Sequence, residues 1–296
     1  MIPRVTVIVL THNNLDDTLE CLGSVSESDH ANFDVLLVDN HSTDGSIENI
    51  RALFPDIHYL VNATNLGVAG GRNAGWQYAR EHLPADFLCF LDNDTVMKPE
   101  TLRLLSESLS EHPDVAIACG KAYTAPPSTT IMSVGMRVNL YTGVVTDIGT
   151  GEADAGQYDS PGYVAACGGF CFMVKHDVFE ECNGLDNGYN PYGFEDVDLC
   201  LRVLEKGYRC YYVPLATLHH KGCKIGRGYV PLYEKYKVKH LFRLLNRHTT
   251  FVQKLTCALC VPARAAARIL RHVGRGELRA VASHLRGAYE LVFRGA

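Results

Sequence analysis

The sequence lacks the two glycine motifs that most often bind nucleotide phosphates. It contains no G-x-x-x-x-G-K-[ST] loop, and no G-x-G-x-x-G follows its first predicted strand. Such loops hold phosphates on backbone N–H groups at the start of a helix. The second absence argues against a dinucleotide-dependent dehydrogenase, and both mean that a phosphorylated ligand needs another kind of binding site.

Long apolar runs and a leader sequence are also missing. No apolar stretch reaches the roughly 18 residues of a membrane span. The start, Met1-Ile2-Pro3-Arg4, leads directly into a predicted strand without the pattern of a signal peptide. We therefore predict a cytoplasmic protein, with peripheral contact at the inner face of the cell membrane as a further expectation.

Positive charge is scarce except near the C-terminus. The formal net charge is -5, but the segment from Arg243 onward has ten Lys and Arg residues and two carboxylates, a charge of +8. The first 242 residues therefore carry -13. This negative charge on residues 1–242 argues against nucleic acid as a partner.

The eleven cysteines give no disulfide or zinc pattern, since their number is odd and they are scattered. Several lie inside apolar runs, as Cys89 does, and a free cysteine packs as a small hydrophobic residue. The single C-x-x-C, Cys257 to Cys260, has no second pair. We interpret it as two thiols on an apolar helix and expect a reducing compartment.

Strand and helix patterns alternate along most of the chain. Strands are predicted at 5–10, 35–38, 57–61, 87–91, 115–119, 163–174 and 208–213, and helices at 16–25, 46–54, 71–83, 100–111 and 196–205. This order predicts an α/β fold with a mostly parallel sheet. Residues 122–163 lack helical spacing and are expected to form a β excursion or loops.

The chain after Leu232 is predicted to be helical. Arginines at 264, 268, 271, 275 and 279 step by three or four, so they share one helix face unless Gly274 and Gly276 divide it. This basic face is a solvated surface by default. Anionic lipid is one alternative partner, and another protein or a second protomer is the other.

Polar clusters follow three of the predicted strands. They begin at Thr11, at Asp39 and at Asp92. Each cluster alone is most simply a turn. Together they are more informative, because the carboxyl ends of parallel strands meet at one edge, where ligands bind.

The cluster Asp92-Asn93-Asp94 places two carboxylates one residue apart. Both reach one cation only if the backbone turns there, and hard oxygen ligands suit Mg²⁺ or Mn²⁺. Further on, Glu195 and Asp196 open a predicted helix, where acidic residues also favour the helix dipole. The functional alternative is a general base. His219 and His220 follow the last strand, and either is a candidate metal ligand.

With these motifs assembled, residues 3–245 resemble family 2 glycosyltransferases of the GT-A fold, in a branch that includes bacterial rhamnosyltransferases. The segments that carry the resemblance are 7–13, 38–46, 65–73, 91–94, 193–202 and 220–222, in the family's order and spacing. It implies a Rossmann-like sheet flanked by helices, with residues 246–296 as a basic helical extension.

The resemblance also implies roles for individual residues. The nucleotide-sugar site is expected to include Thr11, Asn13, Asp39, Asn65, Gly67, Gly71, Arg72, Asn73, Asp92 and Asn93, with Asp39 accepting a hydrogen bond from a uracil or thymine ring. Asp94 is the expected direct metal ligand, Asp92 lies near ribose and metal, and His220 completes a site for Mn²⁺ or Mg²⁺. Asp196 is the expected base and Glu195 positions the acceptor.

The implied reaction is an inverting transfer from a dTDP- or UDP-sugar, with dTDP-rhamnose as one candidate, to a glycan, lipid-linked or other hydroxyl acceptor in cell-surface glycan synthesis. A nucleotidyltransferase is the first alternative, but it needs a basic, glycine-rich loop after the first strand, which is absent. A non-catalytic sugar-binding module is the second, although both carboxylate pairs are intact.

Overall fold

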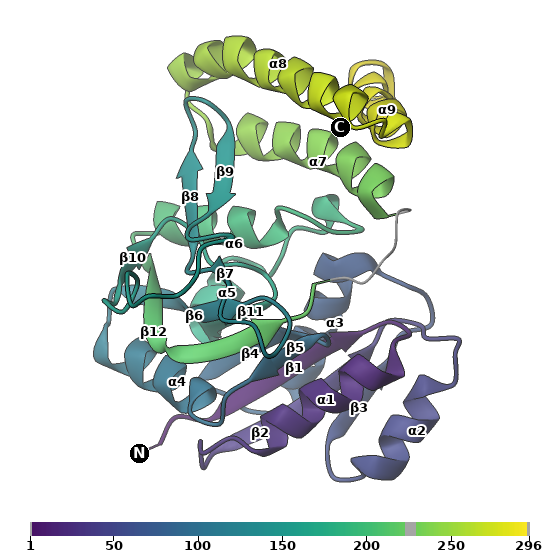
Figure 1. Ribbon diagram of the computed structural model, residues 1–296. Helices are drawn as coiled ribbons and strands as arrows, with labels where there is room; N and C mark the ends of the chain where they lie inside the picture. Colours follow the sequence, from purple (N-terminus) through teal and green to yellow (C-terminus); the bar gives the residue numbers. More distant parts are fainter. Residues whose placement is uncertain (1, 223–228, 295–296) are drawn as a thin grey trace. The chain divides into compact units, whose positions relative to one another are not determined.

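The computed structural model describes residues 2–222 and 229–294 (Figure 1). Met1 and Cys223, one of the eleven cysteines, lie outside these ranges. The described chain divides into two compact units. The first comprises residues 1–136, 147–191 and 195–222, and the second comprises residues 137–146, 192–194 and 223–296.

The first unit is built around one mixed sheet. Its strands run in the order β10-β12-β6-β11-β4-β1-β2-β3, with β5 paired to β12 and β7 paired to β6. The pairs β1–β2, β1–β4, β2–β3 and β6–β12 are parallel, whereas β11 is antiparallel to β4 and β6. The bounds are β1 Val5–Thr11, β2 Phe33–Asp39, β3 His58–Val61, β4 Phe87–Asp92, β5 Thr95–Met97, β6 Val115–Tyr123, β7 Ile131–Ser133, β10 Gly162–Val164, β11 Cys171–Lys175 and β12 Arg209–His220.

Helices cover both faces of this sheet because its inner strands are apolar on both sides. Val7 and Val9 point to the core shared with Leu22, Ile50 and Leu105, which come from three helices, α1 Leu15–Ser26, α2 Ser46–Leu53 and α4 Thr101–Glu111. The opposite face packs on α3 Gly67–His82 and α5 His176–Glu181. Phe90 of β4 contacts Phe179 of α5, which in turn contacts Trp76 of α3. The remaining elements are α6 Glu195–Glu205 and a 3-10 helix, Asn187–Tyr189.

The predicted α/β fold is confirmed, with differences at three elements. The strand predicted over 163–174 is two strands, β10 and β11, because the chain between them turns at Gly168 and Gly169 toward α6. The strand predicted to end at Val213 continues to His220, past an irregularity between Val213 and Thr217. The helix predicted from Gly71 begins earlier, at Gly67.

The second unit is a set of helices with a short hairpin. Helices α7 Tyr229–His248, α8 Phe251–Gly274 and α9 Leu278–Arg294 follow one another, and α7 packs along α9. The hairpin is formed by β8 Met136–Asn139 and β9 Val144–Asp147. The expected boundary at 245/246 therefore falls inside α7, whose residues contact α9.

Two sequence-level expectations about the whole chain can be compared with the described residues. All ten cysteines within them are free, nine of them are buried, and Cys257 and Cys260 lie on α8 as predicted. Within the described ranges, every helix is too short or too polar to cross a bilayer.

Candidate active site

The register of two strands brings Asp92, Asp94 and His220 together. Asp92 ends β4, and a two-residue turn places Asp94 just before β5. β5 pairs antiparallel with the end of β12, with Thr95 opposite His220, and the Lys221 N–H donates to the Asp94 carbonyl at 3.0 Å. One ligand atom from each of the three side chains lies within 4.8 Å of the others.

The electrostatics of this group favour a cation. His220 Nε2 lies 3.1 Å from Asp94 Oδ1. Burial lowers the pKa of His220, but the hydrogen bond to Asp94 and the charges of Asp94 and Asp92 outweigh it, so that the pKa is raised. Two carboxylates and one imidazole in this arrangement fit Mn²⁺ or Mg²⁺, and the nitrogen ligand favours Mn²⁺.

His219 belongs to the other side of β12, since successive side chains along a strand point to opposite faces. Its Nε2 lies 3.2 Å from the Ser128 carbonyl oxygen, and its ring packs on Tyr123. The structure therefore favours His220 over His219 as the candidate ligand.

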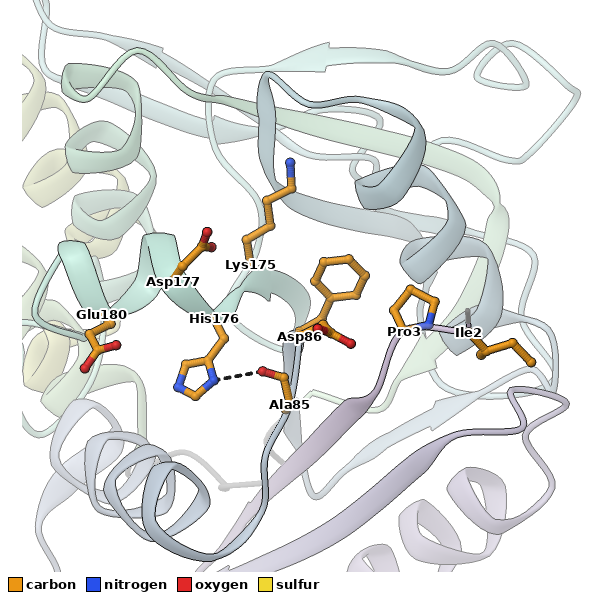
Figure 2. A pocket seen from close by; sticks show the side chains of 9 residues that line it. Ile2, Pro3, Ala85, Asp86, Lys175, His176, Asp177 and Glu180 are labelled. Atoms are coloured by element: carbon orange, nitrogen blue, oxygen red, sulfur yellow. Dashed lines mark hydrogen bonds between the residues drawn. The ribbon is translucent and has the colours of Figure 1, made fainter.

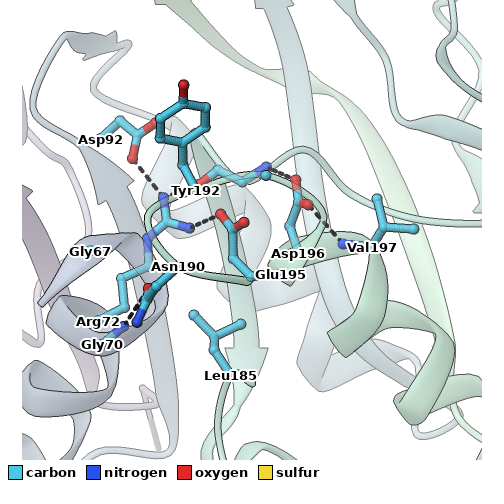
Figure 3. A network of polar contacts seen from close by, with 12 residues as sticks. Gly67, Gly70, Arg72, Asp92, Leu185, Asn190, Tyr192, Glu195, Asp196 and Val197 are labelled. Carbon is cyan, nitrogen blue, oxygen red and sulfur yellow. Dashed lines mark hydrogen bonds and ion pairs between the residues drawn. The ribbon is translucent and has the colours of Figure 1, made fainter. Parts of the chain in front are cut away.

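Arg72 connects this group to the start of α6 (Figure 3). It projects from α3 and is 1% exposed. Its Nη2 donates to Asp92 Oδ1 and to the Gly169 carbonyl, both at 2.6 Å, and its Nη1 lies 3.6 Å from Glu195 Oε1. The buried guanidinium of Arg72 thus holds the carboxylates of Asp92 and Glu195 at the same edge of the sheet.

Asp196 is half-buried beside this guanidinium. Its Oδ2 accepts from the Gly169 N–H at 2.7 Å, and its Oδ1 accepts from the Val197 N–H at 2.8 Å. Burial raises the pKa of Asp196 to about 6, against the lowering effect of these N–H groups and of Arg72. A carboxylate with such a pKa is charged at neutral pH yet accepts a proton more readily than an exposed one.

Gly169 is a site residue that the sequence analysis missed. A Cβ there would lie 3.1 Å from Asp196 Oδ2 and 3.3 Å from Arg72 Nη1. The available signal was the Gly168-Gly169 pair inside an otherwise strand-like run, which marks a bulge or a close approach.

The residues expected to bind the nucleotide form a hydrogen-bonded frame at the ends of β1 and β2. Asp39, 1% exposed, accepts from the Ser42 N–H at 3.0 Å and from the Ser42 hydroxyl at 2.5 Å. Asn13 accepts from the Thr43 N–H at 2.8 Å. The Asn93 amide donates to the Thr11 hydroxyl at 3.1 Å. Asp39 and Asn13 thus shape the 40–44 loop.

Asn40 was not singled out in the sequence, although it lies within the 38–46 motif. It is 3% exposed and its amide donates to Asn65 Oδ1 at 3.0 Å and to the Gly67 carbonyl at 3.1 Å. Its side-chain Oδ1 accepts from the Leu66 N–H at 3.0 Å. Asn40 therefore fixes the segment that leads into α3.

The glycines of α3 are explained by packing within the protein. A Cβ on Gly67 would lie 2.5 Å from Asn190 Oδ1, and one on Gly71 would lie 2.5 Å from Leu10 Cδ1. The side chain of Asn73 bonds Leu185 N and O at 2.9 and 2.7 Å. These three residues position the site edge by joining α3 to its neighbours.

A hollow of about 730 Å³ lies at the opposite end of the sheet (Figure 2). Phe87, which begins β4, and Lys175, which ends β11, are among its lining residues. His176 there has both ring nitrogens engaged, with the Ala85 carbonyl at 3.0 Å and the Trp76 indole N–H at 3.2 Å. The carboxyl-end cluster, not this hollow, is therefore the candidate active site.

Two family models match the chain. The model described as glycosyl transferase family 2 matches residues 6–182, more than half of the sequence. A second, described as the N-terminal domain of galactosyltransferase, matches residues 153–226. The matched ranges together include Asp92, Asp94, Asp196 and His220.

Curated relatives match most of the chain at low identity. An N-acetylglucosaminyl-diphospho-decaprenol L-rhamnosyltransferase of Mycobacterium tuberculosis is 26% identical over 82% of this chain and 84% of its own length. The rhamnosyltransferase WbbL of Escherichia coli K12 is 23% identical over 82% of this chain and 93% of its own length.

Solved structures share the fold. The mannosyltransferase PcManGT of Pyrobaculum calidifontis, in complex with GDP-Man and Mn²⁺, aligns with a TM-score of 0.63 and 18% identity, covering 100% of this chain and 89% of that one. GalNAc-T7 with UDP, GalNAc and Mn²⁺ aligns with a TM-score of 0.61 and 15% identity over 81% of this chain, which spans half of that longer protein. These likenesses show the GT-A fold.

Proposed function

Because the chain belongs to glycosyl transferase family 2, we propose that it transfers a sugar from a nucleotide diphosphate donor to a hydroxyl group, with inversion at the anomeric carbon. The proposed donor is a dTDP- or UDP-sugar, with dTDP-rhamnose first, because two similar proteins are named rhamnosyltransferases. The proposed acceptor is a lipid-linked or other glycan hydroxyl in cell-surface glycan synthesis. This is supported by the mycobacterial relative, which is named as acting on an N-acetylglucosaminyl-diphospho-decaprenol.

The strongest support is the arrangement around Arg72. This buried side chain touches Asp92 of the candidate metal group and Glu195 at the start of α6, next to Asp196. The residues proposed for the donor site and the proposed base would thereby lie at one edge, where a displacement reaction needs both. In the part of the chain that the structure describes, no comparable arrangement of residues supports the nucleotidyltransferase alternative.

The residues divide the reaction between them. The acceptor hydroxyl gives its proton to Asp196 as its oxygen bonds to the anomeric carbon. The bond from that carbon to the diphosphate oxygen breaks at the same time, and the electron pair leaves with the nucleoside diphosphate. The role proposed for Glu195, which Arg72 holds, is to accept a hydrogen bond from the acceptor and orient it.

Asp94, Asp92 and His220 are the residues that would hold Mn²⁺ or Mg²⁺. When bound there, such an ion supplies Lewis-acid stabilisation of the negative charge on the diphosphate leaving group. Arg72 limits the role of Asp92, since one of its oxygens is already engaged.

The test is a panel of UDP-, dTDP- and GDP-sugars with Mn²⁺, followed by thermal unfolding and by donor hydrolysis. A donor at 100 times its Kd should stabilise the fold by about 2.7 kcal/mol. We expect a Mn²⁺-dependent response to at least one dTDP- or UDP-sugar. If no donor stabilises the protein or is hydrolysed, the proposal is wrong.

A further inference from the structure

Helix α8 exposes apolar side chains to solvent, while polar side chains on its other side pack against the helical unit. Its six large exposed hydrophobic side chains are each between 50% and 78% exposed: Phe251, Val252, Leu255, Leu259, Leu270 and Val273. At about 100° of rotation per residue, they fall within an arc of about 100° on the helix. We call these six residues the α8 stripe.

The opposite side of α8 is polar and faces the rest of its unit. Arg268 Nε donates to Glu234 Oε2 of α7 at 2.6 Å, and His272 Nε2 lies 3.8 Å from Glu234 Oε1. Further along, Arg264 donates to the Thr142 carbonyl in the hairpin at 2.8 Å, and Cys257 Sγ lies 3.1 Å from the Leu140 carbonyl oxygen.

This polar packing fixes the direction of the stripe. Glu234 is 1% exposed, so turning α8 over would bury the stripe only by breaking the Arg268 ion pair and removing this cation from a buried carboxylate. The first turn is also held, because Thr250 and Gln253 form a reciprocal capping box. The stripe is therefore a stable surface feature.

Charge decides between the kinds of partner that such a stripe fits. The segment from Arg243 onward carries a formal charge of +8, and Lys254, Arg271 and Arg275 are exposed on or next to α8. Two copies of this segment placed face to face would bring like charges together. An anionic lipid surface satisfies both properties, since its headgroups attract the basic residues and its acyl chains receive the apolar ones.

We propose that the α8 stripe docks the protein on an anionic lipid bilayer, with α8 lying in the plane of the interface. At 1.5 Å per residue, the 24 residues of α8 extend about 36 Å along the surface. The inference depends on the helical unit alone. It is tested without donor or acceptor, so its failure would leave the proposed transfer reaction untouched.

The experiment is flotation of the full-length protein with vesicles of phosphatidylcholine and with vesicles of phosphatidylcholine and phosphatidylglycerol in equal parts. We expect binding to the anionic vesicles that weakens as salt is raised. Leu259→Glu and Leu270→Glu, on two separated turns, should each reduce the bound fraction about tenfold or more. The matched control is Leu53→Glu on α2, which makes the same charge change at a side chain 63% exposed in the other unit.

A second readout places a fluorophore on the stripe. The chain has one tryptophan, Trp76, which is 5% exposed. In Leu259→Trp, emission should shift to the blue when anionic vesicles are added, and the unsubstituted protein should show no shift. The proposal is overturned if the protein ignores anionic vesicles, if Leu259→Glu binds as well as Leu53→Glu, or if Leu259→Glu only converts a dimer to a monomer.

Discussion

At the scale of single residues, Asp196 combines burial with two backbone hydrogen bonds. The N–H groups of Gly169 and Val197 orient both of its oxygens, while burial keeps the carboxylate basic. Neither property follows from the Glu195-Asp196 pair in the sequence, where a favourable helix dipole accounted equally well for two acids at a helix start.

Replacing Asp196 with Asn should abolish transfer while sparing donor binding. The amide keeps the size of the side chain but cannot accept the acceptor's proton, and loss of a general base costs about 10²- to 10⁴-fold in rate. Initial rates and donor-dependent thermal shifts measure the two effects. Asp56→Asn, in an exposed loop, is the matched control and should leave both unchanged; turnover retained in Asp196→Asn would refute the base assignment.

The pH dependence of transfer should report the same group. Burial raises the pKa of Asp196 from 3.8 to about 6, so the carboxylate that the reaction needs is lost as pH falls below about 6. We expect kcat/KM to drop about tenfold per pH unit below that value and to level off above it. The contribution of Asp196 to folding stability depends on pH in the opposite direction. Folding favours the protonated form, so this stabilisation is full below pH 3.8 and is lost as pH rises through about 6. A flat profile between about pH 5 and 8 would contradict the assignment.

The two adjacent histidines offer a direct test of the candidate metal group. His220→Ala removes a ligand from the cluster with Asp92 and Asp94, and the Mn²⁺ concentration for half-maximal activity should rise about tenfold or more. His219→Ala is the matched control, because its ring contacts the Ser128 carbonyl and Tyr123 instead. Equal effects of the two substitutions would show that His220 is not a metal ligand.

At the scale of elements, the glycines of the helices fall into two classes. A Cβ on Gly71 of α3 would lie only 2.5 Å from Leu10 Cδ1, closer than Cβ atoms approach, and 3.2 Å from Asn40 Nδ2. Gly23 on α1, in contrast, has no neighbour within 4 Å of where a Cβ would stand. Gly67 and Gly71 were both expected in the nucleotide-sugar site. At Gly71 the close neighbour is Leu10 of the sheet, so packing within the protein already accounts for this glycine.

These two positions should respond in opposite directions to alanine. Gly71→Ala should lower the free energy of unfolding by about 1–3 kcal/mol through overpacking. Gly23→Ala should raise it by about 0.5–1 kcal/mol, because alanine favours the helix and has room there. Denaturant unfolding of both variants measures the difference, and an unchanged midpoint for Gly71→Ala would contradict the packing explanation.

One buried carboxylate on α7, that of Glu234, contacts both other helices of its unit, through Arg268 of α8 and His284 of α9. The pKa of Glu234 is lowered from 4.5 to about 2, since hydrogen bonds from His284 and Arg268 and nearby positive charge outweigh its burial. A depressed pKa stabilises the fold above the unfolded value, so this contribution is complete above pH 4.5 and is lost as pH falls toward about 2.

Glu234→Gln should therefore destabilise the helical unit by about 1–3 kcal/mol near neutral pH. It should also remove the part of the acid-induced loss of stability that the protonation of Glu234 causes. Circular dichroism melts at pH 7 and near about pH 3 would show a smaller pH effect in the variant. Glu107→Gln on α4, with a half-exposed side chain, serves as control. An identical pH dependence in Glu234→Gln and the unsubstituted protein would exclude this role.

At the scale of the whole molecule, the sequence was informative where side chains alternate regularly and where motifs follow strands. The inner strands, most helix positions and the polar edge were predicted, because apolar runs and turn residues are local signals. Antiparallel β11 and the continuation of β12 to His220 were not, since strand pairing across distant segments leaves no local pattern. Arg72 was expected in the donor site, but its links to Asp92 and Glu195 required the fold.

The irregularity in β12 between Val213 and Thr217 has a consequence for how this chain can vary in length. Ala216 is so close to the sheet that a Cβ on Gly120 would lie 1.9 Å from its carbonyl oxygen, and the offset determines which histidine reaches Asp94. Gaining one residue here would exchange the faces of His219 and His220 and move His219 into the position opposite Thr95 that His220 now occupies. Because the two are identical side chains in neighbouring positions, an imidazole would still point toward the carboxylates. The doublet thus makes this edge tolerant of a one-residue insertion that would remove the ligand from a chain with a single histidine.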